Sequence, residues 1–509
     1  RGITVKSQSV RLNYLAEDGK EYVLNLIDTP GHVDFTYEVS RSMAACEGAL
    51  LLIDSTQGVE AQTVSNTYLA LDAGLEIIPV LNKIDMKNSN ISETKLQVSE
   101  LLGIDKNEIL SISAKSGEGV ESLFTSIIDD IPAPKVYDSG KLKALIFDSY
   151  FDQYRGVVVY VRVVSGKISK KTIIKFFKYE GLCEVLEVGI LKINKVPADL
   201  LKEGDVGYII LNIKDVSKIK VGDTLTDKNN PVSEPLEGYK PIKPMVFSGL
   251  YPIDSQDYQD LRVSLEKLKL NDSSLQFTPN TSQALGFGFR CGFLGPLHME
   301  IVQERLEREF NMDLITTCPN VRYKMQLQDK TFEYLENPSE FPDVSTIENI
   351  FEPYIRAEII SPSEFIGAIM KICVNRRAIY QSTNFLSKDK VQLIFNMPLG
   401  EIIYEFFEKL KASTKGYATL DYELIEDKPG NLKKLDIKIA GEIVDALSII
   451  VHKDSAYKHG SELCKQLKKL IPRHQFEVPI QATIGNKIIA RETVRSFRKN
   501  VIAKCYGGD

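Results

Sequence analysis

Two short polar motifs near the start of the chain each follow a short apolar run. Asp-Thr-Pro-Gly-His at residues 28–32 follows the run 22–27, and Asn-Lys-Ile-Asp at residues 82–85 follows the run 77–81. Apolar runs that end in polar residues are typical of buried strands in a parallel α/β sheet, whose carboxyl edge binds nucleotides. The two motifs therefore predict an α/β domain with a nucleotide site at that edge.

The residue types in these motifs favour a guanine nucleotide. Asp28 at a strand end can hold Mg²⁺ through water, and Gly31 lets a backbone N–H approach the γ-phosphate. Asp85 can accept both N–H groups on the Watson–Crick side of guanine, whereas adenine has no such pair there. Ser-Ala-Lys at residues 113–115, after the run 109–112, would complete the base pocket. The three motifs in this order predict GTP or GDP as ligand, together with Mg²⁺.

Length and composition describe an ordinary multidomain globular chain. Its 509 residues are too many for one hydrophobic core, so we expect three to five domains. No run of eighteen or more apolar residues occurs, so no transmembrane helix is predicted. The seven cysteines lie singly, which favours reduced thiols in a cytosolic compartment over a zinc site or a disulfide framework.

Charge is unevenly distributed along the chain. The net charge of −6 alone speaks against a nucleic-acid partner, yet residues 451–509 hold twelve Lys and Arg against five Asp and Glu. This segment therefore carries +7, and local basicity matters more than the total for contact with phosphate backbones. A basic face that is merely solvated is the alternative interpretation.

The first 236 residues predict two domains. Residues 1–134 alternate strands and helices, which indicates a parallel sheet covered by helices, with strands expected at 7–14, 22–27, 49–54, 77–81 and 109–112 and helices at 33–47, 61–73, 93–102 and 120–131. Pro132-Ala133-Pro134 ends this domain as a stiff linker. Residues 141–236 change to short β-rich runs separated by turns, as in a small β-barrel.

Two α+β units follow, at residues 241–320 and 351–428. Each has the β-α-β-β-α-β order of a ferredoxin-like fold. In the first, Tyr258, Leu261, Leu265 and Leu268 share one helix face and predict a core stripe. Residues 286–292 are glycine-rich, but their apolar alternation and the lack of a following helix start favour a strand over a phosphate-binding loop.

The last segment, residues 432–509, predicts strands, a helix over 455–470 and a final basic helix over 492–504. On that helix the spacing of four and three would place several basic side chains on one face, as suits RNA phosphates. The candidate RNA contacts of the segment are Lys487, Arg491, Arg495, Arg498, Lys499 and Lys504.

With these motifs and this domain order, the sequence resembles the LepA, or elongation factor four, family of ribosome-binding translational GTPases. Arg-Gly-Ile-Thr at residues 1–4 matches the end of the family's switch I, and residues 28–32 match the start of switch II. The connector at 321–353 is too short for the decoding-site domain that elongation factor G carries there. Residues 490–509 resemble the special C-terminal domain of the family. The resemblance covers nearly the whole chain.

The resemblance assigns a role to each motif residue. It implies that Thr4 and Asp28 hold Mg²⁺, that the Gly31 N–H contacts the γ-phosphate, and that His32 is the catalytic residue that orients the attacking water. The residues that it assigns to the guanine pocket are Asn82, Lys83, Asp85, Ser113, Ala114 and Lys115.

The resemblance also implies a setting for the protein. It implies a monomeric GTP hydrolase in the bacterial cytoplasm that binds the ribosomal factor site and touches tRNA and rRNA. It further implies a fidelity or back-translocation role, in which tRNAs move one codon backward, and peripheral association with the membrane surface.

One family element is missing from the sequence. No Gly-x-x-x-x-Gly-Lys-Ser/Thr loop, which would cradle the phosphates, occurs in the 509 residues, and the first residue is Arg1 instead of Met. We expect that the chain is a fragment of a longer product and that alone it binds GTP poorly and is inactive. The alternatives are a non-hydrolysing ribosome- or RNA-binding scaffold with a degenerate nucleotide domain, and another type of translational GTPase.

Overall fold

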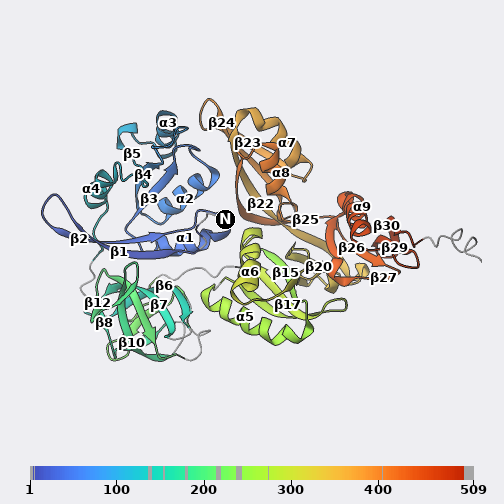
Figure 1. Cartoon of the computed structure of the whole chain (residues 1–509), viewed down its shortest axis with the longest axis horizontal. Coiled ribbons are helices and arrows are strands. Elements are labelled where there is room, and N and C mark those ends of the chain that lie inside the picture. The colour runs from blue at the N-terminus through green and yellow to red at the C-terminus, as the bar shows by residue number, and fades with distance from the viewer. Residues whose placement is uncertain are drawn as a thin grey trace, which may run out of the picture.

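The computed structural model describes residues 4, 6–135, 140–152, 155–177, 181–213, 219, 221–236, 243–272, 274–403 and 405–497. The fold class is the predicted multidomain one, and its parts follow each other along an elongated molecule (Figure 1). The α/β unit and the β-barrel lie at one end, the two ferredoxin-like units follow, and the C-terminal unit lies at the other end.

The α/β unit contains the predicted parallel sheet. Its strands are β3 (Gly48–Asp54), β4 (Glu76–Asn82) and β5 (Leu110–Ser111), paired in that order. The helices are η1 (Val33–Phe35), α1 (Thr36–Met43), α2 (Ala61–Asp72), α3 (Ile91–Leu102), η2 (Lys106–Glu108) and α4 (Val120–Asp130). Because the strands are parallel, Asp54, Asn82 and the loop after β5 reach the same edge of the sheet.

The expectation of a purely parallel arrangement is wrong for the first two strands. β1 (Gln8–Leu15) and β2 (Glu21–Asp28) form a separate antiparallel pair. The connection at residues 16–20 is far too short for a parallel crossover, and Gly19 supplies the left-handed backbone of the tight turn, with φ at 78°.

The second unit is a closed β-barrel. Its strands pair in the order β10-β13-β7-β6-β14-β9, and β9 pairs back with β10. Val157, Val159, Val161 and Val163 alternate into the barrel core from β7. The strands of this unit are β6 (Lys143–Asp152), β7 (Gly156–Ser165), β8 (Lys167–Ser169), β9 (Ile173–Phe176), β10 (Leu182–Leu191), β11 (Lys195–Pro197), β12 (Leu200–Lys202), β13 (Val206–Leu211) and β14 (Thr224–Asp227).

The third unit has the predicted ferredoxin-like order and a sheet paired β16-β17-β15-β18. Leu261, Leu265 and Leu268 are fully buried, as the stripe predicted, and residues 286–292 lie in a strand. The elements are β15 (Val246–Pro252), η4 (Ser255–Asp257), α5 (Tyr258–Asn271), β16 (Gln276–Ser282), β17 (Gly286–Phe293), α6 (Pro296–Glu309) and β18 (Leu314–Thr316).

The fourth unit repeats this arrangement, with β23-β24-β22 in order and β25 on the other side of β22. One connected hydrophobic core contains buried residues of both ferredoxin-like units. The elements are β22 (Ile347–Pro362), η7 (Ser363–Phe365), α7 (Ile366–Val374), β23 (Ile379–Phe385), β24 (Lys390–Pro398), η8 (Leu399–Glu401), α8 (Phe406–Ser413) and β25 (Thr419–Pro429).

The connector between these units is structured. Its β20–β21 hairpin pairs with the first half of β22 and so extends the fourth unit's sheet. The elements are β19 (Asn320–Val321), β20 (Tyr323–Leu327), β21 (Phe332–Leu335), η5 (Pro338–Glu340) and η6 (Val344–Thr346).

In the C-terminal unit the long helix α9 packs on a small antiparallel sheet. The elements are β26 (Leu432–Ile439), β27 (Glu442–Ile443), η9 (Asp445–Leu447), β28 (Ile449–His452), α9 (Lys453–Leu470), β29 (Val478–Ile484) and β30 (Lys487–Val494).

The prediction of a basic helix over 492–504 is wrong for residues 492–497, the part of this segment that the structure describes. Strand β30 continues through Val494, and residues 495–497 are not helical. Pairing with β29 satisfies the backbone of this segment and buries Val494, which an isolated amphipathic helix could not do. Arg491 and Arg495 therefore do not share a helix face. Residues 498–509 lie outside the described part of the chain.

Candidate functional site

The predicted base-pocket residues meet at the carboxyl edge of the parallel sheet. The Asn82 side-chain oxygen accepts hydrogen bonds from the backbone N–H of Lys83 at 2.8 Å and of Ala114 at 3.0 Å. The buried Ser113 hydroxyl donates to the Asp85 carboxylate at 2.8 Å. These bonds tie the loop after β4 to the loop after β5. Asp85 itself is exposed, and only one of its oxygens has a hydrogen bond within the described residues, while Lys115 is exposed beside them.

Sequence reasoning missed Asp54 as a partner of this pocket. Lys83 has a left-handed backbone, with φ at 65°, and its ammonium group contacts the Asp54 carboxylate at 2.7 Å. Burial alone would raise the pKa of Asp54, but hydrogen bonds from Lys83 and Thr56 outweigh it and lower that pKa. The sequence pattern could have indicated Asp54, because this residue ends the apolar run of β3 just as Asn82 ends that of β4.

The second predicted cluster lies at the end of β2. The Thr4 hydroxyl donates to the Asp28 carboxylate at 3.3 Å, so the two predicted Mg²⁺ ligands are adjacent. Hydroxyl and carboxylate oxygens suit Mg²⁺, which usually takes its other ligands from water and nucleotide phosphates. In the described part of the chain, no three or more His, Cys, Asp or Glu side chains are grouped so that they could hold a metal ion. Gly31 faces open space.

His32 caps the short helix η1. Its Nδ1 accepts a hydrogen bond from the Asp34 backbone N–H at 3.2 Å. Burial lowers the pKa of His32, the Asp34 carboxylate opposes this shift, and Lys411 adds to it. A neutral ring whose Nδ1 accepts carries its proton on Nε2. His32 is thus a neutral hydrogen-bond donor next to the open backbone at Gly31.

Asp34, which sequence reasoning also missed, joins three units of the protein. Its carboxylate is 2% exposed and accepts hydrogen bonds from the His298 backbone N–H and the Tyr422 hydroxyl, each at 3.1 Å. His298 lies in α6 of the third unit, and Tyr422 lies in β25 of the fourth. Gly295 makes this possible, because any Cβ there would collide with the Asp34 carboxylate. A charged residue between Val33 and Phe35 was the available sequence signal.

The α/β unit and the fourth unit share further hydrogen bonds near this point. The N–H of Ala61, at the start of α2, donates to the Thr419 hydroxyl at 3.0 Å, and Gln62 donates to the Leu420 carbonyl at 3.1 Å. Lys390 donates to the Gln57 carbonyl at 2.8 Å. The segment containing His32 is therefore held against the ferredoxin-like units by polar contacts on several sides.

His298 also forms a buried hydrogen-bonded pair with Asp272, and its Nδ1 accepts from the Leu294 backbone N–H at 3.0 Å. Its Nε2 lies 2.7 Å from the Asp272 carboxylate, and the two side chains are 1% and 20% exposed. The same contact holds the pKa of Asp272 well below its usual range despite burial.

We expect Asp272→Asn to destabilise the protein by about 1–2 kcal/mol near pH 6, because a neutral amide oxygen replaces the charged acceptor of the buried His298 Nε2–H. The carboxylate contribution is present above about pH 4 and is lost as pH falls. The deficit should therefore persist above about pH 4 and shrink as the pH falls below it.

Urea unfolding of both proteins between about pH 2 and pH 7 measures this deficit. Asp313→Asn, at an exposed position of the same unit, is the matched control and should change stability by less than about 0.5 kcal/mol. A deficit that is constant across this pH range would contradict the assignment.

Three of the predicted RNA contacts lie in the described residues. Lys487 and Arg491 are exposed on β30, and Arg495 is exposed just beyond it. Arg498, Lys499 and Lys504 lie outside the described part. Among the described residues, no helix has the length and apolar character to cross a membrane.

Family models match four parts of the chain. Residues 1–133 match the elongation factor Tu GTP-binding domain, and residues 156–226 match elongation factor Tu domain 2. Residues 349–438 match the elongation factor G C-terminus, and residues 439–509 match the C-terminus of the GTP-binding protein LepA.

Full-length similarity extends to curated proteins described as elongation factor 4. The protein of Halalkalibacterium halodurans is 54% identical over all 509 residues of this chain and 84% of its own length. That of Chlorobium limicola is 55% identical with the same coverage, and that of Bacillus subtilis is 54% identical over 83% of its length. A solved structure from Thermus thermophilus has a similar fold, with a TM-score of 0.58 at 16% identity over 84% of this chain and 89% of its own. The chain belongs to the elongation factor 4, or LepA, family of translational GTPases.

Proposed function

We propose that the protein is a ribosome-dependent GTPase of translation elongation. The observation that carries the proposal is the hydrogen-bonded junction of Asn82, Asp85, Ser113 and Ala114 at one sheet edge. Ser113 uses only one lone pair of the Asp85 carboxylate, so each of its two oxygens can still accept one of the two N–H groups of a guanine base. The Lys83 stem and Lys115 would flank the ring.

The hydrolytic half of the proposal rests on the segment after β2. Thr4 and Asp28 would hold Mg²⁺, which supplies charge neutralisation between the phosphates when it is bound. The Gly31 N–H would contact the γ-phosphate. His32, neutral and with a proton on Nε2, would orient the attacking water once the ribosome places it correctly.

Asp85→Asn tests the guanine assignment. The amide cannot accept both N–H groups of guanine, so GTP affinity should fall by about 10–100-fold, the value of one charge-assisted hydrogen bond. Equilibrium titration of the protein from its native gene, with a fluorescent GTP analogue and with its ATP counterpart, measures the change in affinity. Asp72→Asn, at an exposed position on α2, should leave the GTP affinity unchanged. Equal loss in both variants would refute the assignment.

The same titration addresses the missing phosphate loop. The 509 residues contain no Gly-x-x-x-x-Gly-Lys-Ser/Thr sequence, so we propose that they bind GTP weakly when isolated and do not turn it over. A nanomolar dissociation constant for GTP with these 509 residues would contradict this prediction.

The finer parts of the proposal concern the partners. Exposed Lys487, Arg491 and Arg495 support contact of the C-terminal unit with tRNA or rRNA phosphates.

We propose a monomeric bacterial cytoplasmic factor with peripheral membrane association that moves tRNAs one codon backward. Mapping the ribosome's position on mRNA, before and after addition of the factor and GTP, tests the backward step: an unchanged position would exclude it.

A further inference from the structure

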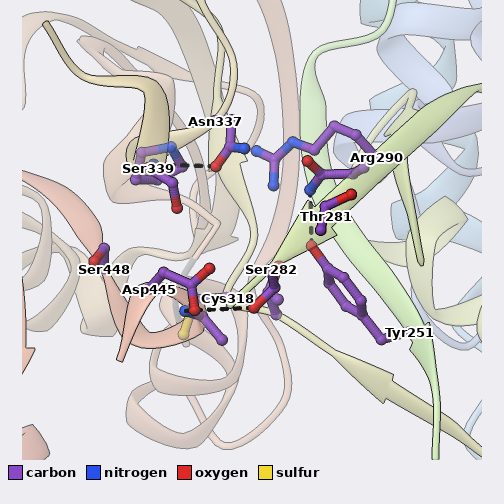
Figure 2. Close-up of a pocket in the computed structure, with 13 residues that line it drawn as sticks. Tyr251, Thr281, Ser282, Arg290, Cys318, Asn337, Ser339, Asp445 and Ser448 are labelled. Atoms are coloured by element: carbon purple, nitrogen blue, oxygen red, sulfur yellow. Dashed lines mark hydrogen bonds between the residues drawn. The ribbon is translucent and has the colours of Figure 1, made fainter. Parts of the chain in front are cut away.

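A polar recess lies where the third unit, the connector and the C-terminal unit meet (Figure 2). It is small and partly open to solvent. Its walls come from β16, β17, η5 and η9 and are mostly polar. The recess is far along the chain from the nucleotide motifs, and none of the roles proposed above uses it.

Arg290 on β17 is the cation of this recess. Its side chain is 8% exposed and extends toward Asn337 (Figure 2). One terminal nitrogen donates to two neutral oxygens, the side-chain oxygen of Asn320 and the Glu336 carbonyl. The Nε atom is buried and has no hydrogen-bond partner, and no bond to Nη1 exists among the described residues.

The carboxylates of Glu336 and Glu340 attract this charge, but no carboxylate of the described residues forms an ion pair with Arg290. The carboxylate of Glu336 pairs with Arg322 instead, and that of Glu340 accepts from Asn337. Asp445 lines the recess, but four donors already surround its carboxylate: the Ser282 hydroxyl at 2.9 Å and the backbone N–H groups of residues 283, 284 and 446 at 2.8, 3.2 and 2.9 Å.

A buried guanidinium without a carboxylate partner is costly for a protein to keep. Burial lowers the pKa of Arg290 only to about 10, so the group stays charged at neutral pH. Two hydroxyl groups at the mouth of the recess, of Thr281 and Ser339, have no hydrogen bond in the described part of the chain and can donate to a ligand. The recess thus offers one charged donor in its depth and neutral donors at its mouth.

We propose that this recess binds a phosphate group, with Arg290 as its anchor and the Thr281 and Ser339 hydroxyls as its outer donors. A guanidinium presents several N–H groups in a fork that fits phosphate oxygens. The glycine-rich residues 286–292 do not form a phosphate-binding loop, because they lie in strand β17. The phosphate would instead be bound by side chains. The phosphate is either free in solution or part of an RNA backbone.

The site would act as a clamp between units. Arg290 and Thr281 belong to the third unit, Ser339 belongs to the connector, and the recess is closed on its far side by Asp445 of the C-terminal unit. A bound phosphate group would therefore hold the connector against the third unit next to the base of the C-terminal unit.

Phosphorus NMR of inorganic phosphate, titrated with the full chain, tests the proposal. We expect saturable line broadening in the unmodified protein and at least about tenfold weaker binding in Arg290→Gln, which removes the charged donor. Arg11→Gln is the matched control, because Arg11 is also largely buried but already pairs with Asp205 at 3.2 Å. This control should bind phosphate normally, which would show that loss of a largely buried arginine elsewhere does not weaken binding.

A second variant keeps the test valid if Arg290→Gln does not fold. Thr281→Val combined with Ser339→Ala changes two exposed positions and should weaken phosphate binding several-fold. Absence of saturable binding in the unmodified protein, or equal binding in all variants, would overturn the proposal. Competition by a short oligouridylate would identify an RNA backbone as the source of the phosphate, and its failure to compete would identify free phosphate.

Discussion

Replacing His32 with Ala is expected to lower ribosome-stimulated GTP hydrolysis by about 10²–10⁴-fold, the usual contribution of a positioned proton-transfer or water-orienting group. The His32 side chain lies one residue after the exposed Gly31 and two before Asp34, whose N–H fixes the orientation of its ring. GTP affinity should stay within about twofold, because the base pocket at Asn82 and Asp85 is untouched. Single-turnover phosphate release with the protein as produced from its native gene measures the effect.

The pH profile of the same reaction checks the protonation state. The folded protein lowers the pKa of His32, so its neutral form persists below the ordinary value of about 6.5. Hydrolysis should therefore hold as pH falls through 6.5 and decline only below that lowered pKa. A decline centred above pH 6.5, or a His32→Ala variant with normal hydrolysis, would exclude the assigned role.

Asp34→Ala is expected to have the largest effect on how the units are held together. It leaves the His298 N–H and the Tyr422 hydroxyl without their buried acceptor, at a cost of about 1–3 kcal/mol each. It leaves the backbone N–H that orients His32 in place but frees the segment that carries it. We expect faster amide exchange at the start of α6 and along β25, by a factor of about 10–100, and slower ribosome-stimulated hydrolysis.

Two tyrosine variants give the matched comparison. Tyr422→Phe removes one of the two hydrogen bonds to Asp34 and should speed exchange along β25 more than at α6. Tyr417→Phe changes a tyrosine of the same unit whose side chain is 63% exposed, and it should change neither exchange nor hydrolysis. Unaltered exchange in Asp34→Ala would show that Asp34 does not hold the units together.

Local patterns explain which parts of the fold were predictable. The strand-end motifs, the β-α-β-β-α-β repeats and the core stripe of α5 all depend on residues close together in the sequence. The same holds for the proximity of Asn82, Asp85 and Ser113, because parallel strands bring their carboxyl ends to one edge. The proximity of Thr4 and Asp28 came from the family resemblance, since nothing local links them.

Contacts distant in sequence explain what was missed. Asp34 meets residues 264 and 388 positions away, and no periodicity indicates such partners. The segment that starts at Arg491 has helical spacing of basic residues, yet pairing with β29 makes it a strand, because burial of Val494 outweighs local propensity. Likewise, the strand containing Arg290 was predicted. That Arg290 has no carboxylate partner could not be predicted, because its neighbours Asn320 and Glu336 belong to the connector and are distant in sequence.

Phosphate release from GTP and from ATP, each with and without ribosomes, tests the central claim most directly. The protein from its native gene should release phosphate from GTP much faster when ribosomes are present, and it should not do so from ATP. Ribosome-independent rates, or equal rates with both nucleotides, would contradict a ribosome-dependent GTPase that reads guanine through Asp85.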